Sequence, residues 1–160
     1  MPSLPQLLDE DVRVIDRSLQ DFLEKSRASA VLIAAEGGFL IFQQGDTTQF
    51  DPTTISALAA NAFSANQAIA SLLDEAGFAT VYQQGVRRSI LIGQINLHHT
   101  LICIFPASTS VGAVKYFAAF TVQTVAAQLA KAKERAPEHG FDLAMLNMAD
   151  GTQLFRKQSD

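Results

Sequence analysis

The sequence predicts an α/β (α+β) domain in the order α-β-β-α-β-β-β-α, with helices on both faces of an antiparallel sheet. Three observations lead to this fold class. Long segments carry apolar residues every three or four positions, a pair of short apolar runs is joined by a glycine turn, and three more strand-like runs follow a central helix. With 48% apolar residues in 160, the chain can fill one core.

The first helix is predicted over residues 9–27. Its apolar residues recur at spacings of three and four, which places them on one helix face. They are Leu8, Val12, Ile15, Leu19 and Phe22. Three acidic residues begin the segment and two basic residues end it, as the helix dipole favours.

A β-hairpin and a second helix follow. Residues 30–35 and 39–43 are short apolar runs, and Gly37 and Gly38 between them can take the positive φ of a tight turn. Asp51 and Pro52 then form a helix start, because an Asp side chain caps the helix and proline suits its first position. The second helix is predicted from residue 52 to 73 or 74.

Three antiparallel strands are predicted over residues 78–83, 89–95 and 100–105. Several strands are apolar on both alternating faces, so helices must cover the centre of the sheet on both sides. A third helix is predicted over residues 111–133, ended by Pro137 and Gly140. The remaining segment, 136–160, is predicted to be a tail with an apolar middle between Phe141 and Met148.

Composition excludes several classes of function. The net charge of −4 and the lack of a basic block longer than Arg87-Arg88 argue against binding to nucleic acid. We expect neither a signal peptide nor a membrane span, because no segment has eighteen uninterrupted apolar residues. The single cysteine, Cys103, lies in an apolar run and fits a cytoplasmic protein without disulfides.

The residues that suggest chemistry have simpler interpretations. His98 and His99 are adjacent, so their rings diverge, and we interpret them as a polar turn rather than a metal site. Cys103 has no neighbour in sequence that would lower its pKa. Arg87 and Arg88 fit a solvated strand edge better than an arginine finger for a GTPase. We therefore expect no enzyme, no metal and no cofactor.

Three local features together resemble the Roadblock/dynein-light-chain family, most of all its bacterial members that regulate Ras-like GTPases. These features are the strand and turn of residues 31–38, the alanine-rich helix of residues 56–62, and the helix start Val111-Gly112-Ala113-Val114-Lys115. The resemblance covers residues 7–135, which we take as the domain. It implies a five-stranded antiparallel sheet with the central helix on one face and the terminal helices on the other.

The resemblance also implies a homodimer, joined through the third strand and the central helix, and a GTPase docked on the resulting helix pair. The sequence supports an interface here independently. From Pro52 to Leu73 the chain has no charged residue, whereas a helix facing solvent normally carries charges. The alternative is a helix buried within one subunit. The predicted interface residues are Ala57, Ala60, Asn61, Ser64, Ala65, Gln67, Ala68, Thr80 and Tyr82.

Two functions are therefore carried forward. The first is a cytoplasmic homodimeric regulator or scaffold that binds a Ras-like small GTPase, either as a platform alone or by stimulating GTP hydrolysis. The second is a profilin-like or PAS-like small-ligand sensor, which would need a cavity with converging polar groups. An enzyme would need a nucleophile and a base within reach of one another, and the sequence offers no convincing pair.

Overall fold

The computed structural model describes residues 6–139 of the 160-residue chain. Its element order is α-β-β-α-β-β-β-α, which confirms the predicted fold class. The helices are α1 (Asp9–Ser26), α2 (Pro52–Leu72) and α3 (Val111–His139), with a short 3-10 turn, η1 (Glu36–Gly38), after the first strand. The strands are β1 (Ala30–Ala35), β2 (Leu40–Gly45), β3 (Thr80–Gln83), β4 (Arg88–Asn96) and β5 (His99–Pro106).

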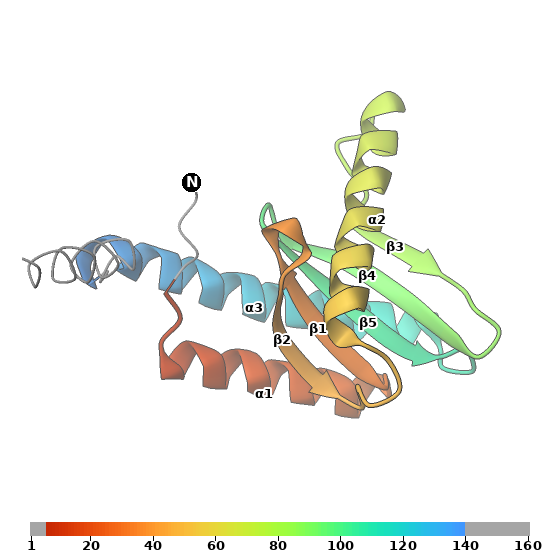
Figure 1. The fold of residues 1–160 in the computed structure, drawn as a ribbon, viewed down its shortest axis with the longest axis horizontal. Helices are drawn as coiled ribbons and strands as arrows, with labels where there is room; N and C mark the ends of the chain where they lie inside the picture. The colour runs from red at the N-terminus through yellow and green to blue at the C-terminus, as the bar shows by residue number, and fades with distance from the viewer. Residues whose placement is uncertain (1–5, 140–160) are drawn as a thin grey trace, which may run out of the picture.

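The five strands form one antiparallel sheet in the order β2-β1-β5-β4-β3 (Figure 1). The last strand, β5, is the centre of the sheet, because it pairs with β1 on one side and with β4 on the other. The strands β2 and β3 are the two edges. The predicted hairpin and meander are thus joined through β1 and β5.

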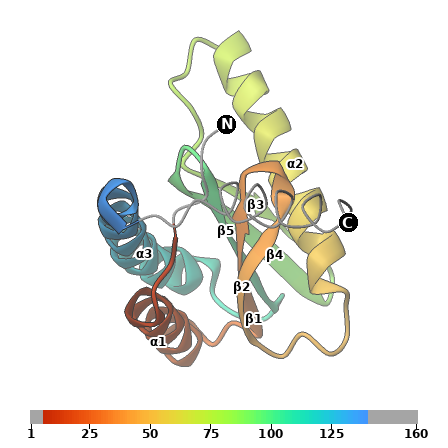
Figure 2. The same ribbon diagram turned by 60° about the vertical axis from the view of Figure 1, so that its left-hand side comes forward.

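The sheet is covered on both faces, as its apolar strands predict (Figure 2). On one face α1 and α3 pack over a core that includes Ile15, Phe22 and Phe105. On the other face α2 packs over a smaller core that includes Phe63 and Ile102. Alternate residues of each strand enter the two cores because successive side chains of a strand point to opposite faces.

Local signals set the starts and turns of these elements. The Asp51 side chain accepts a hydrogen bond from the Thr53 N–H at 3.1 Å, which caps α2 just before Pro52. Asp11 performs a similar role for α1 by accepting from the Leu8 N–H at 2.8 Å. Both Gly37 and Gly38 have φ near +83°, the conformation that the glycine turn predicts.

The end of α3 differs from the prediction. The helix continues through Pro137 to His139, about six residues beyond the predicted end. A proline removes one backbone hydrogen bond, and a long helix that is already packed can tolerate this loss in its last turns. The apolar middle predicted for the tail lies outside the described residues, and the boundary after residue 135 stays a prediction.

Within residues 6–139, no helix combines the length and the apolar character that crossing a membrane requires.

Candidate functional site

Helix α2 is anchored to the sheet at one end and projects beyond it at the other (Figure 1). Its main contacts are with η1, β1 and β2. Few side chains of α2 are buried for a helix of 21 residues, and only Phe63 among them is large: Ser56, Ala59, Phe63 and Ala70. The Ser56 hydroxyl donates a hydrogen bond to the Gly38 carbonyl at 2.9 Å, which holds the start of α2 against η1.

The outer face of α2 carries a regular stripe of exposed residues. They recur at spacings of four, three, four, three and four, the spacing that lines one side of a helix. The stripe consists of Thr54, Leu58, Asn61, Ala65, Ala68 and Leu72. Leu58 is 61% exposed and Leu72 is 85% exposed, so two large apolar side chains lie on the same exposed row of the helix. We call these six residues the α2 stripe.

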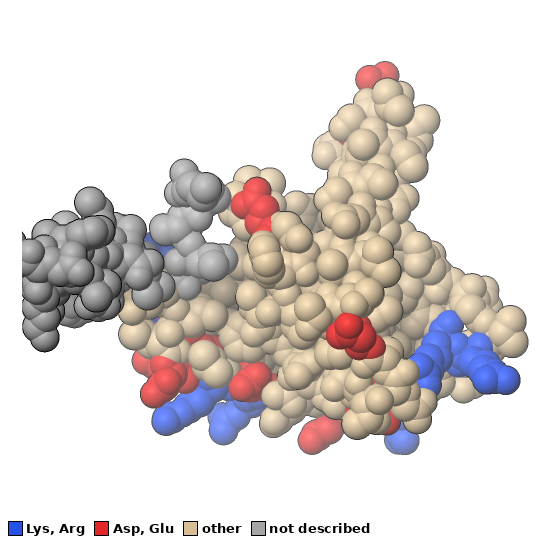
Figure 3. Space-filling view, viewed as in Figure 1, with Lys and Arg blue, Asp and Glu red and all other residues tan. Residues whose placement is uncertain are grey.

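The surface around the α2 stripe is uncharged along most of the helix. In Figure 3 acidic side chains appear at the projecting tip of α2, near its base and at the top of the β1–β2 hairpin, and basic ones gather over the turn between β3 and β4. The rest of the visible surface of α2 and of the sheet beneath it carries no charge. Charges gather instead along the lower edge, over α1.

The predicted interface residues of α2 divide into two groups. Asn61, Ser64, Ala65 and Ala68 are exposed on the outer side. Ala57 and Ala60 are half-buried toward the sheet. The backbone of Ala57 lies so close to Gly38 that a Cβ on this glycine would be 2.7 Å from the Ala57 Cα. This close approach of the Ala57 backbone leaves no room for a side chain at position 38.

Gln67 has a role inside the chain that the sequence did not indicate. Its side-chain nitrogen donates to the Phe78 carbonyl at 2.7 Å, and its side-chain oxygen accepts from the Phe78 N–H at 3.0 Å. These two bonds tie the projecting half of α2 to the segment that leads into β3. The Gln67 amide is therefore already occupied.

The edge strand β3 offers a free row of backbone groups. The Ala79 carbonyl accepts from the Gln94 N–H at 3.2 Å, so Ala79, Val81 and Gln83 point their backbone groups toward β4. By alternation, Thr80 and Tyr82 point their N–H and C=O groups outward. Their side chains lie on the α3 face, where the Tyr82 ring stacks on Phe105 with centroids 6.1 Å apart. Thr80 and Tyr82 thus present backbone, not side chains, beside α2.

Several exposed apolar residues were missed in the sequence. Leu58 and Leu72 belong to the α2 stripe, and Ile69 and Leu73 flank it. The 3-4 spacing of the stripe is the signal that would have found them. Because both sides of α2 are apolar or small, no polar face revealed which side points outward.

The histidines and the cysteine have structural roles. The Nδ1 of His98 lies 3.0 Å from Glu36, whereas the Nδ1 of His99 lies 2.9 Å from Asn96, so the two rings diverge. Burial and the neighbouring His98 lower the pKa of His99, and Glu36 opposes the shift. Burial raises the pKa of the Cys103 thiol. Among the described residues, no three His, Cys, Asp or Glu side chains are grouped as a metal site.

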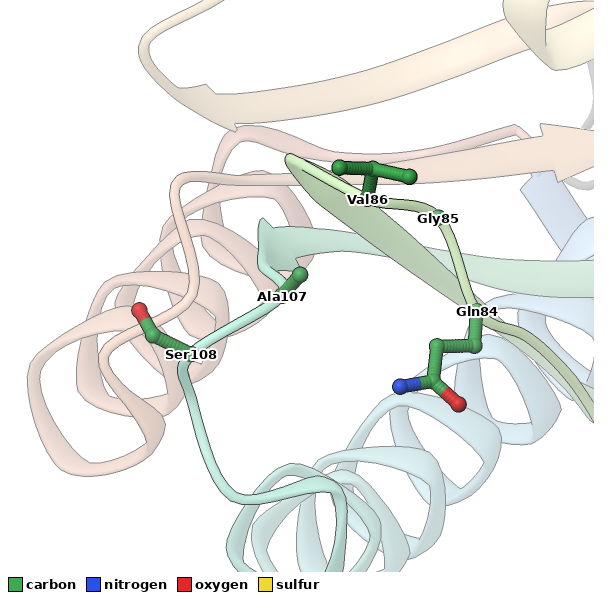
Figure 4. Close-up of a pocket in the computed structure, with 5 residues that line it drawn as sticks. All are labelled: Gln84, Gly85, Val86, Ala107 and Ser108. Carbon is green, nitrogen blue, oxygen red and sulfur yellow. The ribbon is translucent and has the colours of Figure 1, made fainter.

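A pocket of about 620 Å³ opens between the β3–β4 and β5–α3 turns (Figure 4). It is lined by Gln84, Gly85, Val86, Ala107 and Ser108. Gln84 reaches toward the opening, while the Ser108 hydroxyl points away from it. None of the five side chains can act as an acid or base near neutral pH.

Near this pocket, the Arg88 guanidinium donates a hydrogen bond to the Gln49 side chain, and both side chains are exposed. This contact fits the solvated strand edge that the sequence predicts for Arg87 and Arg88.

Comparison with known proteins supports the fold. No family model matches the sequence, and no curated protein matches it. Three solved structures are similar. Myxococcus xanthus MglB has 23% identity and a TM-score of 0.67 over 71% of this chain and 92% of its own. The gliding protein MglB of Thermus thermophilus has 23% identity and a TM-score of 0.73, and the match covers 82% of this chain and 98% of that protein.

The third is a Roadblock/LC7 domain from Streptomyces avermitilis, with 13% identity and a TM-score of 0.66 over 71% of this chain and 96% of that domain. All three matches span nearly the whole of the similar protein. At these identities the likeness concerns the fold. The resemblance inferred from the sequence is confirmed at that level: the chain has the Roadblock/LC7 fold.

Proposed function

We propose that this chain is a non-enzymatic homodimeric regulator that binds a Ras-like small GTPase. The observation that carries the proposal is the α2 stripe, an exposed and uncharged helix face beside a free strand edge. The GTPase as partner follows from the family that the sequence resembles and from the fold that it shares. We place the protein in the cytoplasm, since its single cysteine is a buried free thiol.

The α2 stripe is suited to pairing with itself. If two α2 helices pack antiparallel about a two-fold axis near Phe63, Leu58 of one copy faces Ala68 of the other, and Asn61 faces Ala65. Thr54 faces Leu72 in the same register. Each larger side chain then meets a smaller one, which lets two helices approach closely without a void. Because the α2 stripe has no charged residue, its burial does not require the desolvation of a charge.

The free edge of β3 supports the same axis. Antiparallel pairing of β3 with its counterpart would satisfy the outward N–H and C=O groups of Thr80 and Tyr82. It would also extend the sheet from five to ten strands. Val81 and Ile90 are only half-buried on the α2 face, and a second α2 would cover them. The predicted interface residues of β3 thus act through their backbone.

The GTPase is proposed to dock on the outer surface of the α2 pair. Ser64 and Ser71, which are exposed and lie outside the α2 stripe, can hydrogen-bond there without the desolvation cost of charges. We propose no catalytic group on this chain. Any stimulation of GTP hydrolysis would act by repositioning residues of the GTPase itself. We also propose residues 7–135 as the functional domain and residues 136–160 as an appended segment.

The test measures mass by light scattering and GTP hydrolysis by the Ras-like GTPases of the source organism. We expect a dimer, a complex with one of these GTPases, and an altered hydrolysis rate. Asn61→Arg and Ala65→Arg should weaken dimerisation or GTPase binding, while Gln43→Arg, an exposed glutamine on β2, should leave both unchanged. Unchanged mass and unchanged GTPase binding in both α2 variants would refute the proposal.

A further inference from the structure

Helix α3 has a second uncharged and exposed face, on the opposite side of the sheet from α2. No residue from Tyr116 to Ala130 is charged. The exposed residues of this stretch include a stripe at spacings of four, three, four and three: Tyr116, Phe120, Gln123, Ala127 and Ala130. Tyr116 is 61% exposed and Phe120 is 54% exposed. Their rings pack edge to face, with the ring centroids 5.1 Å apart. We call these five residues the α3 stripe.

Helix α1, which lies beside α3, has an outer face of the opposite character. Its exposed residues recur at spacings of three, four, three and four: Glu10, Arg13, Arg17, Gln20 and Glu24, and the exposed Arg27 follows directly after the last helical residue. The exposed charged residues beside this row are Asp9, Asp21 and Lys25. With them, the order of charge along the segment is negative, negative, positive, positive, negative, negative, positive, positive. Reading the order backwards gives the opposite sign at every position. The α1 face is therefore complementary to an antiparallel copy of itself.

The middle of the exposed face of α1 lies beside the middle of the α3 stripe. The two helices run antiparallel, because Asp11 near the start of α1 contacts Gln128 and Arg135 late in α3. Midway along, Ser18 and Thr124 line one groove of about 310 Å³ together with Phe120. Figure 2 shows α1 and α3 as one layer on the same face of the sheet. A single two-fold axis through this groove can thus relate both helices to their counterparts.

We propose that the outer layer of α1 and α3 docks against the same layer of a second copy, as an antiparallel four-helix contact. In this arrangement Arg13 faces Glu24 of the second copy, and Glu10 faces its Arg27. Arg17 faces its Asp21. Each pair occurs twice because the contact is two-fold symmetric. Opposite charges therefore meet along the whole length of α1.

The α3 stripe fits the same axis. Tyr116 faces Ala130 of the second copy and Phe120 faces its Ala127, so each aromatic ring meets a small residue. Gln123 faces Gln123, and two amides at a two-fold axis can exchange hydrogen bonds. The neutral seam of α3 thus supplies apolar burial, while the charges of α1 fix the register. This contact is on the opposite face of the sheet from α2 and does not depend on the proposed α2 contact.

A charge exchange tests the pairing on α1. Arg13→Glu and Glu24→Arg each place like charges opposite one another, so each should weaken association through this layer roughly tenfold. The double variant restores opposite charges and should recover most of the lost association. Association is measured by sedimentation in the Ala65→Arg background at low salt, where exposed charges are least screened. A double variant as weak as the single variants would overturn the proposal.

A cysteine at the axis gives a second, independent readout. Gln123→Cys should form a disulfide between copies under mild oxidation, because the axis brings the two Cβ atoms within bonding range. Gln43→Cys replaces another exposed glutamine, on the other face of the sheet, and is the matched control; native Cys103 is buried. Thermal unfolding confirms that both variants are folded. Equal rates of covalent dimer formation in the two variants would overturn the proposal, and this result leaves the α2 contact untouched.

Discussion

Asp11 on α1 and Arg135 on α3 form an ion pair between a fully buried carboxylate and a partly exposed guanidinium. The same carboxylate accepts from the Leu8 N–H and from the Gln128 amide. Burial alone would raise the pKa of Asp11, but these hydrogen bonds and the charge of Arg135 outweigh it and hold the pKa below its ordinary value. The pair joins the first and last helices of the described chain.

Asp11→Asn should lower the free energy of unfolding by about 1–3 kcal/mol at pH 7, because charge-assisted hydrogen bonds are lost from a buried site. The folded-state pKa lies below the unfolded-state pKa, so the stabilisation is present above about pH 4 and is lost as the pH falls through the folded-state value. The difference in the free energy of unfolding between Asp11→Asn and the wild-type protein should therefore become smaller in acid. Denaturant unfolding from pH 3 to 7 measures it. Asp16→Asn, on a half-buried site of α1, is the control, and a loss as large as that of Asp11→Asn would contradict the assignment.

Gln67→Ala should release the segment before β3. The variant removes both hydrogen bonds to Phe78 and should cost roughly 1–2 kcal/mol, since the Phe78 backbone is only partly exposed. The expected signature is faster hydrogen exchange of the Phe78 amide with the rest of the sheet still protected. Asn66→Ala is a matched control because Asn66 donates only to its own helix, at Ala62. Equal exchange in the two variants would show that Gln67 does not hold this segment.

Gly38→Ala should destabilise the protein more than Gly37→Ala. Both glycines have φ near +83°, so any side chain there carries a similar backbone strain of roughly 1–2 kcal/mol. At Gly38 the new Cβ would also meet the Ala57 backbone at 2.7 Å, whereas at Gly37 it would meet the movable ring of Phe39 at 3.2 Å. Thermal unfolding of the two variants isolates the packing of α2 on η1. Equal melting temperatures would mean that this close approach is relieved at little cost.

Thr80→Pro should weaken association while keeping the fold. The Thr80 N–H points to the free edge of β3, so its loss removes no bond to β4. Val81→Pro is the opposite case, because the Val81 N–H belongs to the β3–β4 ladder and its loss should lower thermal stability. Sedimentation and thermal unfolding of the two variants separate these effects. If Thr80→Pro associates like wild type, the β3 edge is not part of the contact through α2.

Much of the fold follows from short-range signals in the sequence. Asp51 and Pro52 mark the start of α2, and Gly37 and Gly38 mark the first turn, because each residue suits one backbone geometry. The end of α3 does not follow in this way. A proline weakens a helix by a fixed local amount, and the packing of the preceding turns decides whether the helix continues.

The order of the strands and the outward sides of the helices depend on long-range contacts. Strands β1 and β5 are apolar on both faces, so either could have been placed at the centre or near an edge. Gln67 resembled a rim residue, because nothing in its neighbourhood indicates that Phe78 comes within reach. The stripes on α1, α2 and α3 are periodic in the sequence, but only the fold shows which side of each helix points outward.

The central position of β5 also determines when the sheet can be completed during synthesis. The hairpin of β1 and β2 and the pair of β3 and β4 each contain only sequential partners, whereas β1 must wait for residues 99–106 to emerge from the ribosome. Until then the nascent chain holds two separate half-sheets, each with an unpaired inner edge. The same inner strand joins the two halves at the last step, so any stop or truncation before Thr100 leaves a chain with two exposed edges that invite aggregation.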